Sequence, residues 1–359
     1  MTTNTARLVE VHRLAVAGDE AGIARDVGNR VSRVWLRTSR FADVARVAEA
    51  TLTLGPDAGA LYDLGWVQRA TGRPREALDV YEQALALYRA AGHRWNEAAT
   101  LNGIGFVYDN LGERGRALQY YEQALPIQRE VGNRAGEAAN LSNIGAVYNG
   151  LGKLARALQY YQQALPIQRE VGDRAGEAIT LTNIGAAYRG LGELARALEY
   201  YEQALPISRE VGDRASEATT LTNVGLVYAN LGEPVRALEY YEQALPIRRE
   251  VGDRAGEATT LNNIGGVHHN LGKPVRALEY YEQALLIRRE VGDKAGEAVT
   301  RYNMAMIHRA QGDLDAAVAE LERVIHLDRQ VGHPDLQSDT AMLEQVRQEQ
   351  ARTRPGPQP

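Results

Sequence analysis

Cysteine is absent from this sequence of 359 residues, and phenylalanine and tryptophan are scarce, with two and three residues. Without thiols the chain has no disulfide, no thiolate nucleophile and no cysteine-based zinc site, which fits a reducing compartment. No eighteen apolar residues run together, and Glu10 and His12 interrupt the place where a signal peptide needs an apolar core. We therefore expect a soluble, cytoplasmic protein that does not associate with membranes.

A large charge of one sign is also missing. The net charge is -5 and the pI is near 5.9, with acidic and basic residues interleaved along the chain. Binding to a polyanion requires a basic patch or stripe, and none is visible here. The sequence therefore predicts no nucleic-acid partner.

What the sequence has in abundance is repetition. Residues 201–240 and 241–280 agree at 32 of 40 positions. Glycines recur every forty residues, and Ala305 takes the seventh place in a series that otherwise comprises Gly65, Gly105, Gly145, Gly185, Gly225 and Gly265. A fixed period in this range is typical of stacked repeat arrays, in which one unit cannot bury its apolar face alone. We expect Gly185 to lie where two helices approach most closely.

Each unit reads as a pair of helices. In the third copy, apolar and small residues recur at three- and four-residue spacing over about 135–151 and again over about 154–171. Gly152 and Gly172 are placed to end these helices in the left-handed conformation, and Asp173 is placed to cap the next helix. The predicted fold class is all-α, an α-solenoid of stacked antiparallel helix pairs.

The predicted organisation has four parts. Residues 1–56 form degenerate helices, over about 4–17, 22–37 and 41–53, which either cap the array or join it to another domain. Residues 57–336 form seven repeats. Residues 337–351 form a capping helix with a polar outer face, and residues 352–359 are a disordered tail.

Prolines occupy two kinds of position in the second helices. Pro234 and Pro274 fall at helix starts, where a missing amide costs nothing. Four copies also carry a proline inside the second helix, namely Pro126, Pro166, Pro206 and Pro246. Either these prolines bend the helices and set the curvature of the central array, or duplication propagated a tolerated flaw.

These residues resemble the tetratricopeptide repeat. The third copy carries the small and large consensus residues of that family at the family's spacing, as Leu141, Ile144, Gly145, Tyr148, Gly152, Ala157, Tyr161 and Ala164. The common unit is about 34 residues long, whereas this one has forty, and Arg169 replaces the family's closing proline. The longer unit is similar to repeats of kinesin light chain and Leu-Gly-Asn adaptors, and to arrays of bacterial signalling NTPases and regulators.

The resemblance implies a right-handed superhelix whose first helices line a concave groove. On that face Asn143, Asn183, Asn223, Asn263 and Asn303 form an asparagine ladder. Amides donate and accept hydrogen bonds, so the ladder either pairs with the backbone of an extended peptide or bonds across the stack or to the backbone of a neighbouring helix. The other predicted peptide-binding residues are Thr182, Thr222, Asn262, Arg189, His269 and Arg309.

No residue set predicts catalysis, a metal or a cofactor. His268 and His308 occupy equivalent places in adjacent units, but they replace packed tyrosines such as Tyr148, and no carboxylate shares the position. The tandem tyrosines are interpreted as packing residues. The sequence thus favours a non-catalytic scaffold that binds a protein or peptide. The alternative is the sensor or oligomerisation arm of a signal-transducing NTPase or transcriptional regulator system.

Overall fold

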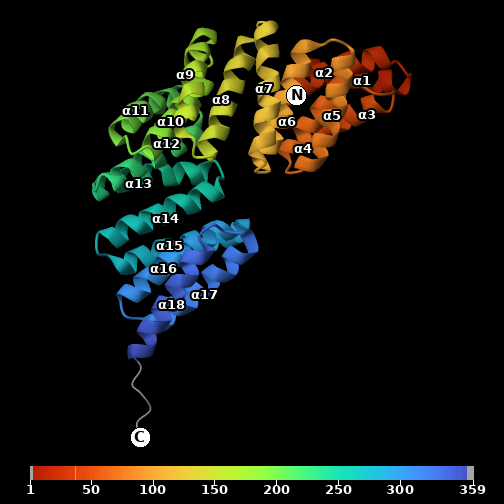
Figure 1. Cartoon of the computed structure of the whole chain (residues 1–359). Coiled ribbons are helices and arrows are strands. Elements are labelled where there is room, and N and C mark those ends of the chain that lie inside the picture. The colour runs from red at the N-terminus through yellow and green to blue at the C-terminus, as the bar shows by residue number, and fades with distance from the viewer. Residues whose placement is uncertain (1–2, 37, 354–359) are drawn as a thin grey trace. The chain divides into compact units, whose positions relative to one another are not determined.

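The structure is a computed structural model that describes residues 3–36 and 38–353. Eighteen α-helices and no strand occur in this part of the chain, as predicted (Figure 1). The helices group into two compact units, which we call unit 1 (residues 1–176) and unit 2 (residues 177–359). The expected tail beyond residue 353 and the expected end of the second helix at residue 37 lie outside the described residues.

Each forty-residue repeat is a pair of packed helices (Figure 1). Within unit 1 and within unit 2, successive helices run in opposite directions. The first helices are α4 (Ala58–Ala70), α6 (Arg94–Asn110), α8 (Arg134–Gly150), α10 (Arg174–Gly190), α12 (Arg214–Asn230), α14 (Arg254–Asn270) and α16 (Lys294–Ala310). The second helices are α5 (Pro74–Ala90), α7 (Arg114–Glu130), α9 (Leu154–Val171), α11 (Leu194–Glu210), α13 (Pro234–Glu250), α15 (Pro274–Val291) and α17 (Leu314–Val331).

A glycine and a tyrosine form the centre of each of the first six helix pairs. Tyr201 is fully buried, and a Cβ atom added to Gly185 would lie 2.6 Å from its ring. This close approach explains why the glycine recurs every forty residues. The seventh pair carries Ala305 and Leu321 instead, which pack in one cluster. A smaller partner on the second helix makes room for the extra methyl group on the first.

The first tyrosine of the tandem pair in the second helix stacks on the first helix of the same repeat. Tyr160 and Tyr148 lie with ring centroids 5.5 Å apart and planes 12° apart. The guanidinium of Arg156 lies 5.6 Å from the centre of the Tyr148 ring. The tandem tyrosines are therefore packing residues, as the sequence predicted.

The predicted helix ends are confirmed. Gly152 and Gly172 both have φ of 70°, the left-handed conformation that favours glycine. The Asp173 carboxylate accepts a hydrogen bond from the Gly176 amide at 2.9 Å. Helices α7, α9, α11 and α13 each continue without interruption through their interior proline.

A buried glutamate clamped by two arginines links successive repeats. The side chain of Glu217 on α12 is 5% exposed and accepts from Arg209 Nε of α11 at 2.8 Å. Arg214 also pairs with Glu217, and its Nη2 reaches Glu250 of α13 at 3.0 Å. Equivalent clamps surround Glu97, Glu137 and Glu257. The sequence reasoning missed this network, although its residues recur in register.

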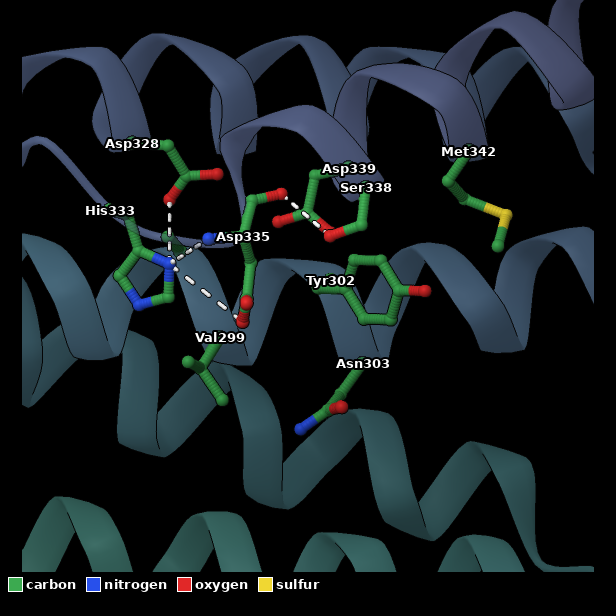
Figure 2. A pocket seen from close by; sticks show the side chains of 10 residues that line it. Val299, Tyr302, Asn303, Asp328, His333, Asp335, Ser338, Asp339 and Met342 are labelled. Atoms are coloured by element: carbon green, nitrogen blue, oxygen red, sulfur yellow. Dashed lines mark hydrogen bonds and ion pairs between the residues drawn. The ribbon is translucent and has the colours of Figure 1, made fainter. Parts of the chain in front are cut away.

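The array ends at the capping helix α18 (Leu336–Thr353), which begins one residue before the predicted start. It continues through residues 352 and 353, which were expected in the disordered tail. Leu343 and Val346 pack against Ala305 and Leu321, and this burial covers the last repeat. The turn between α17 and α18 holds His333 and Asp335 (Figure 2).

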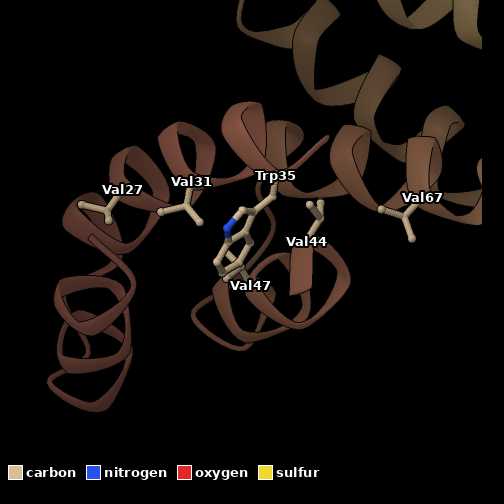
Figure 3. Close-up of a cluster of buried hydrophobic side chains, with 6 residues drawn as sticks. All are labelled: Val27, Val31, Trp35, Val44, Val47 and Val67. Carbon is tan, nitrogen blue, oxygen red and sulfur yellow. The ribbon is translucent and has the colours of Figure 1, made fainter. Parts of the chain in front are cut away.

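Three helices precede the regular repeats: α1 (Thr3–Ala17), α2 (Ala21–Leu36) and α3 (Phe41–Leu52). Five buried residues of α2 and α3 form a cluster with Val67 of α4, namely Val27, Val31, Trp35, Val44 and Val47 (Figure 3). The degenerate helices therefore pack directly on the first repeat and cover its apolar face.

Candidate functional site

A pocket of about 270 Å³ opens among the first helices α12, α14 and α16 of unit 2. Four residues that the sequence singled out line it: Asn262, Asn263, His269 and Asn303. Leu226, Tyr241 and Tyr281 also contribute to its lining. We call this the asparagine pocket. It combines amide groups with aromatic and aliphatic surface, as ligand-binding pockets commonly do.

Helical spacing brings these residues together. Asn262 and Asn263, Gly266, and His269 lie on successive turns of α14, and Asn303 occupies the place of Asn263 in the next repeat. Gly266 has no side chain, so the space above it stays open. A Cβ atom added there would meet only the Tyr281 hydroxyl, at 3.6 Å, which shows that this space is free of other protein atoms. Leu226 and Met306 stand at the same position in the neighbouring repeats.

The asparagine ladder bonds across the stack at two of its five positions. Asn143 in unit 1 donates from Nδ2 to Asn102 Oδ1 at 3.1 Å. Asn303 in unit 2 donates from Nδ2 to Asn262 Oδ1 at 3.4 Å, an oxygen that also accepts from Thr300. The inter-repeat alternative is thus realised at these sites. Each bond uses one of the two N–H donors on the amide.

The other ladder positions retain hydrogen-bonding capacity in different degrees. All five asparagines are partly buried, including Asn183 and Asn223. The Nδ2 atom of Asn263 is buried and has no hydrogen-bond partner among the described residues. A buried amide donor without a partner is costly, so Asn263 is a place where a ligand acceptor would be favourable.

Thr182 and Thr222 were expected to face the groove, but the structure buries them to 7% and 6% exposure. The Thr182 hydroxyl donates to the Ala178 carbonyl at 3.0 Å and lies 2.9 Å from the Thr220 hydroxyl. The equivalent contacts of Thr222 join α12 to α14. Short polar side chains at these positions therefore hold neighbouring first helices together.

The two predicted arginines have neighbours within the chain. Arg309 donates from Nε to Glu349 at 2.9 Å and from Nη2 to the same carboxylate at 2.5 Å, so the capping helix occupies it. Burial raises the pKa of Tyr201 to about 12, and the nearby Arg189 guanidinium opposes this rise. His269 is the exposed member of the predicted set.

A second pocket in unit 2, between α16, α17 and α18, was missed by the sequence reasoning. Asp328, Asp335 and Asp339 line it together with His333 (Figure 2). We call it the acidic pocket. Its signal was available, since Asp328 stands where the preceding copies have Gln168, Ser208, Arg248 and Arg288. That position varies, and a search for recurring residues passes over it.

The described residues offer neither a metal site nor a membrane-spanning helix. No group of three or more histidine, aspartate or glutamate side chains in them could hold a metal ion. His268 stacks on Tyr280 with ring centroids 5.3 Å apart, which makes it a replacement for a packed tyrosine. None of the described helices has the length and apolar character required to cross a membrane.

Three solved structures with similar folds share little sequence with this chain. A signal transduction ATPase with numerous domains from Pyrococcus horikoshii, which has a tetratricopeptide repeat sensor, aligns with a TM-score of 0.69 at 16% identity. That alignment covers 90% of this chain and 49% of the ATPase, so this chain spans about half of its length. A Rap protein complexed with competence and sporulation factor aligns with a TM-score of 0.63 at 14% identity, over 92% of this chain and 99% of the Rap protein.

A third solved structure is the Rap conjugation gene regulator of plasmid pLS20 in complex with the Phr* peptide. It aligns with a TM-score of 0.62 at 13% identity, over 92% of this chain and 97% of the regulator. Identities this low show a shared fold and no more. The search of curated proteins finds no match.

Sequence models of one family match most of the chain. One tetratricopeptide repeat model matches residues 96–170, 136–210, 176–250 and 256–330. A second model of the same repeat matches residues 60–94. These matches coincide with the helix pairs described above and with their glycine and tyrosine positions. The chain belongs to the tetratricopeptide repeat family.

Proposed function

We propose that the asparagine pocket of unit 2 binds an extended peptide segment of a partner protein, and that the chain acts as a non-catalytic scaffold. The observation that carries this proposal is the convergence of Asn262, Asn263 and Asn303 with an apolar floor. Tetratricopeptide repeat folds are generally non-catalytic. We further propose a cytoplasmic location, and partners that are proteins rather than nucleic acids or membranes.

The chemistry of the pocket suits a peptide backbone. Amide side chains offer both donors and acceptors at close spacing, which an extended main chain can satisfy whatever its side chains. Asn263 has an unpaired donor, and Tyr241 and Tyr281 offer apolar surface to a side chain. Asn183, Asn223, Arg189 and His269 are proposed to extend the contact along the first helices of unit 2. Thr182, Thr222 and Arg309 are left out, because the fold already uses them.

The experiment is a selection from a random library of displayed twelve-residue peptides on the full chain. Enriched peptides are then measured by fluorescence anisotropy against variants. We expect Gly266→Leu to fold normally, since Leu226 is tolerated at the same position, and to weaken binding about tenfold or more by filling the pocket. Asn263→Ala should also weaken binding.

Asn110→Ala, an exposed position at the end of α6 in unit 1, is the matched control and should leave affinity unchanged. If no peptide is enriched, or if Gly266→Leu binds every enriched peptide as well as the parent chain does, the proposal is wrong.

The alternative role, as a sensor arm of a signalling NTPase or regulator, draws support from the fold shared with the sensor-bearing ATPase. It differs from the scaffold in one measurable respect. A sensor arm should change the nucleotide hydrolysis of an attached or neighbouring NTPase when peptide binds. A scaffold should capture its partner without any such change.

A further inference from the structure

The acidic pocket has a volume of about 440 Å³ and lies between α16, α17, the following turn and α18 (Figure 2). Val299, Tyr302 and Met342 give it apolar walls. Asp328, Asp335 and Asp339 supply carboxylates from α17, the turn and α18. No lysine or arginine is among the described residues that line it.

Asp328 is the least satisfied group in this pocket. The residue has 0% exposure, and neither carboxylate oxygen has a hydrogen-bond partner among the residues that the structure describes. His333 Nδ1 lies 4.0 Å from Asp328 Oδ1, beyond hydrogen-bonding distance. A buried carboxylate without donors is strongly unfavourable unless a positive group joins it.

Two further side chains of the pocket, His333 and Ser338, are engaged with Asp335. His333 Nδ1 lies 3.3 Å from the Asp335 amide nitrogen and 3.8 Å from an oxygen of the Asp335 carboxylate. The Ser338 hydroxyl donates to the Asp335 carbonyl at 2.7 Å, which uses its only proton. The pocket therefore has three carboxylates and no lysine or arginine in its lining, so a positively charged ligand group that carries hydrogen-bond donors would complement it.

The closeness of the three carboxylates also favours a positively charged ligand group. Burial raises the pKa of Asp339 to about 6, followed by a hydrogen bond that protonated Asp339 makes with Asp328 and by the Asp328 and Asp335 charges, while His333 opposes the rise. Once Asp339 is ionised, it no longer offers Asp328 a donor. Near neutral pH the carboxylates repel one another in a partly enclosed space. A bound cation would relieve this repulsion.

The chain itself shows what fits at this position. In the two preceding repeats the residue equivalent to Asp328 is an arginine, Arg248 or Arg288, and both are buried. Arg248 donates from Nη2 to Thr219 Oγ1 at 3.1 Å and pairs with Asp253. Two repeats thus fill this space with a guanidinium of their own, whereas the last repeat replaces it with an aspartate and leaves a cavity.

We propose that the acidic pocket binds the guanidinium group of an arginine side chain in the peptide ligand. The inference rests on the proposed function, and Asn303 connects the two sites because it lines both pockets. The aliphatic part of the ligand arginine would lie against Val299, Tyr302 and Met342. A metal ion is a poorer fit, since no described cluster has a suitable set of ligands.

The test uses n-butylguanidinium as the probe and the Met342 methyl group as the reporter. The sequence has four methionines, so methyl-labelled methionine gives a simple NMR spectrum of the full chain. We expect a saturable shift of the Met342 signal and little change at Met304, which is buried in another cluster. The neutral isostere n-butylurea should produce no shift.

Variants separate binding from folding. Asp328→Asn should weaken n-butylguanidinium binding about tenfold to a hundredfold, the range expected for a charge-assisted pair. Its melting temperature should be equal to or higher than that of the parent chain, because an unpaired buried charge is removed. Asp328→Arg should abolish binding by placing a guanidinium in the pocket, as Arg288 does. Glu344→Gln, an exposed position on α18, is the control.

Binding should also weaken as pH falls through about 6, because Asp339 then gains a proton. The other titratable or charged groups around it are Asp328 on α17, His333 and Asp335 in the turn, and Arg309 and Tyr302 on α16, with Arg309 held by Glu349. Asp339→Asn should flatten the pH profile.

The outcomes distinguish the two proposals. Selected peptides that lack a preference for arginine over citrulline, and that bind Asp328→Asn unchanged, would overturn the arginine pocket and leave the peptide scaffold intact. Equal shifts with n-butylurea would also overturn it. Conversely, a Met342 response specific to n-butylguanidinium without any selected peptide would support the pocket and contradict the scaffold.

Discussion

At the scale of single residues, the repeat depends on close contact between a glycine and a tyrosine. The contact is intolerant of added volume, since a Cβ atom on Gly185 would lie 2.6 Å from the Tyr201 ring. The seventh repeat shows how the two positions change together, with Ala305 opposite Leu321. A glycine retained for this reason is a packing residue rather than a flexible one.

We predict that Gly185→Ala destabilises the chain by roughly 1 to 3 kcal/mol, the usual cost of overpacking. Adding Tyr201→Leu should recover part of the loss by recreating the pair found in the seventh repeat. Urea unfolding of the single and double variants measures this. A double variant with the summed loss of both single changes would show that the two positions are not coupled.

A second residue-scale prediction concerns Asp63 on α4. Burial raises the pKa of Asp63 to about 7, Asp57 adds to this rise, and the Ser32 hydroxyl opposes it. The folded state therefore binds a proton between about pH 4 and pH 7 that the unfolded state releases. The contribution of this group to stability is favourable at low pH and is lost as pH rises through that window.

Asp63→Asn should remove this dependence and stabilise unit 1 at pH 8 by on the order of 1 to 3 kcal/mol. Unfolding curves at pH 5 and pH 8 test it. A variant less stable than the parent at both values would mean that the carboxylate makes a favourable contact in the folded state.

At the scale of helices, the junction between repeats is held by the clamped glutamates as well as by apolar packing. The side chain of Glu217 is 5% exposed, while those of Arg209 and Arg214 are 50% and 41% exposed. The buried carboxylate has no solvent to replace its arginine partners, whereas the exposed guanidinium groups can be solvated by water. Lys294 replaces the second arginine in the seventh repeat, where Glu297 pairs with Arg289 and Arg301 instead.

We predict that Glu217→Gln destabilises unit 2 by about 1 to 3 kcal/mol, because charge-assisted hydrogen bonds to a buried acceptor are lost. Most of this loss should persist in 1 M salt, since the carboxylate is screened from solvent. The exposed Glu282→Gln is the control and should change stability by less than about 0.5 kcal/mol. Equal effects at the two positions would contradict the clamp.

At the scale of helices, the repeat period predicts features that recur in every copy and misses those that differ between copies. Identical residues in phase predicted the helix pairs, the glycine contacts and the caps, because each follows from spacing and local backbone chemistry. Thr182 was misplaced, since a threonine on a predicted groove face also fits between two helices. The partner of Arg309 lies on the capping helix, outside the repeat. Asp328 was missed because only residues that recur in every copy were considered. It is informative for the opposite reason, since an aspartate stands where the preceding repeat has Arg288.

At the scale of the whole molecule, each repeat contacts chiefly its neighbours, so stability should vary along the chain. On its C-terminal side the last repeat is covered by the single helix α18, through Leu343 and Val346. Repeats in the interior of unit 2 are packed on both flanks. The two ends of the array are thus the places where local opening is expected first.

This arrangement predicts a local effect for Leu343→Ala. The side chain is 6% exposed, and deleting it should cost about 2 to 5 kcal/mol in the C-terminal repeat. Hydrogen exchange should accelerate in α16, α17 and α18, while α12 keeps its protection, because the lost contacts concern only the last repeat. Uniform acceleration through α10 to α18 would instead show that unit 2 opens as one cooperative body. In that case the acidic pocket could not loosen without disturbing the asparagine pocket.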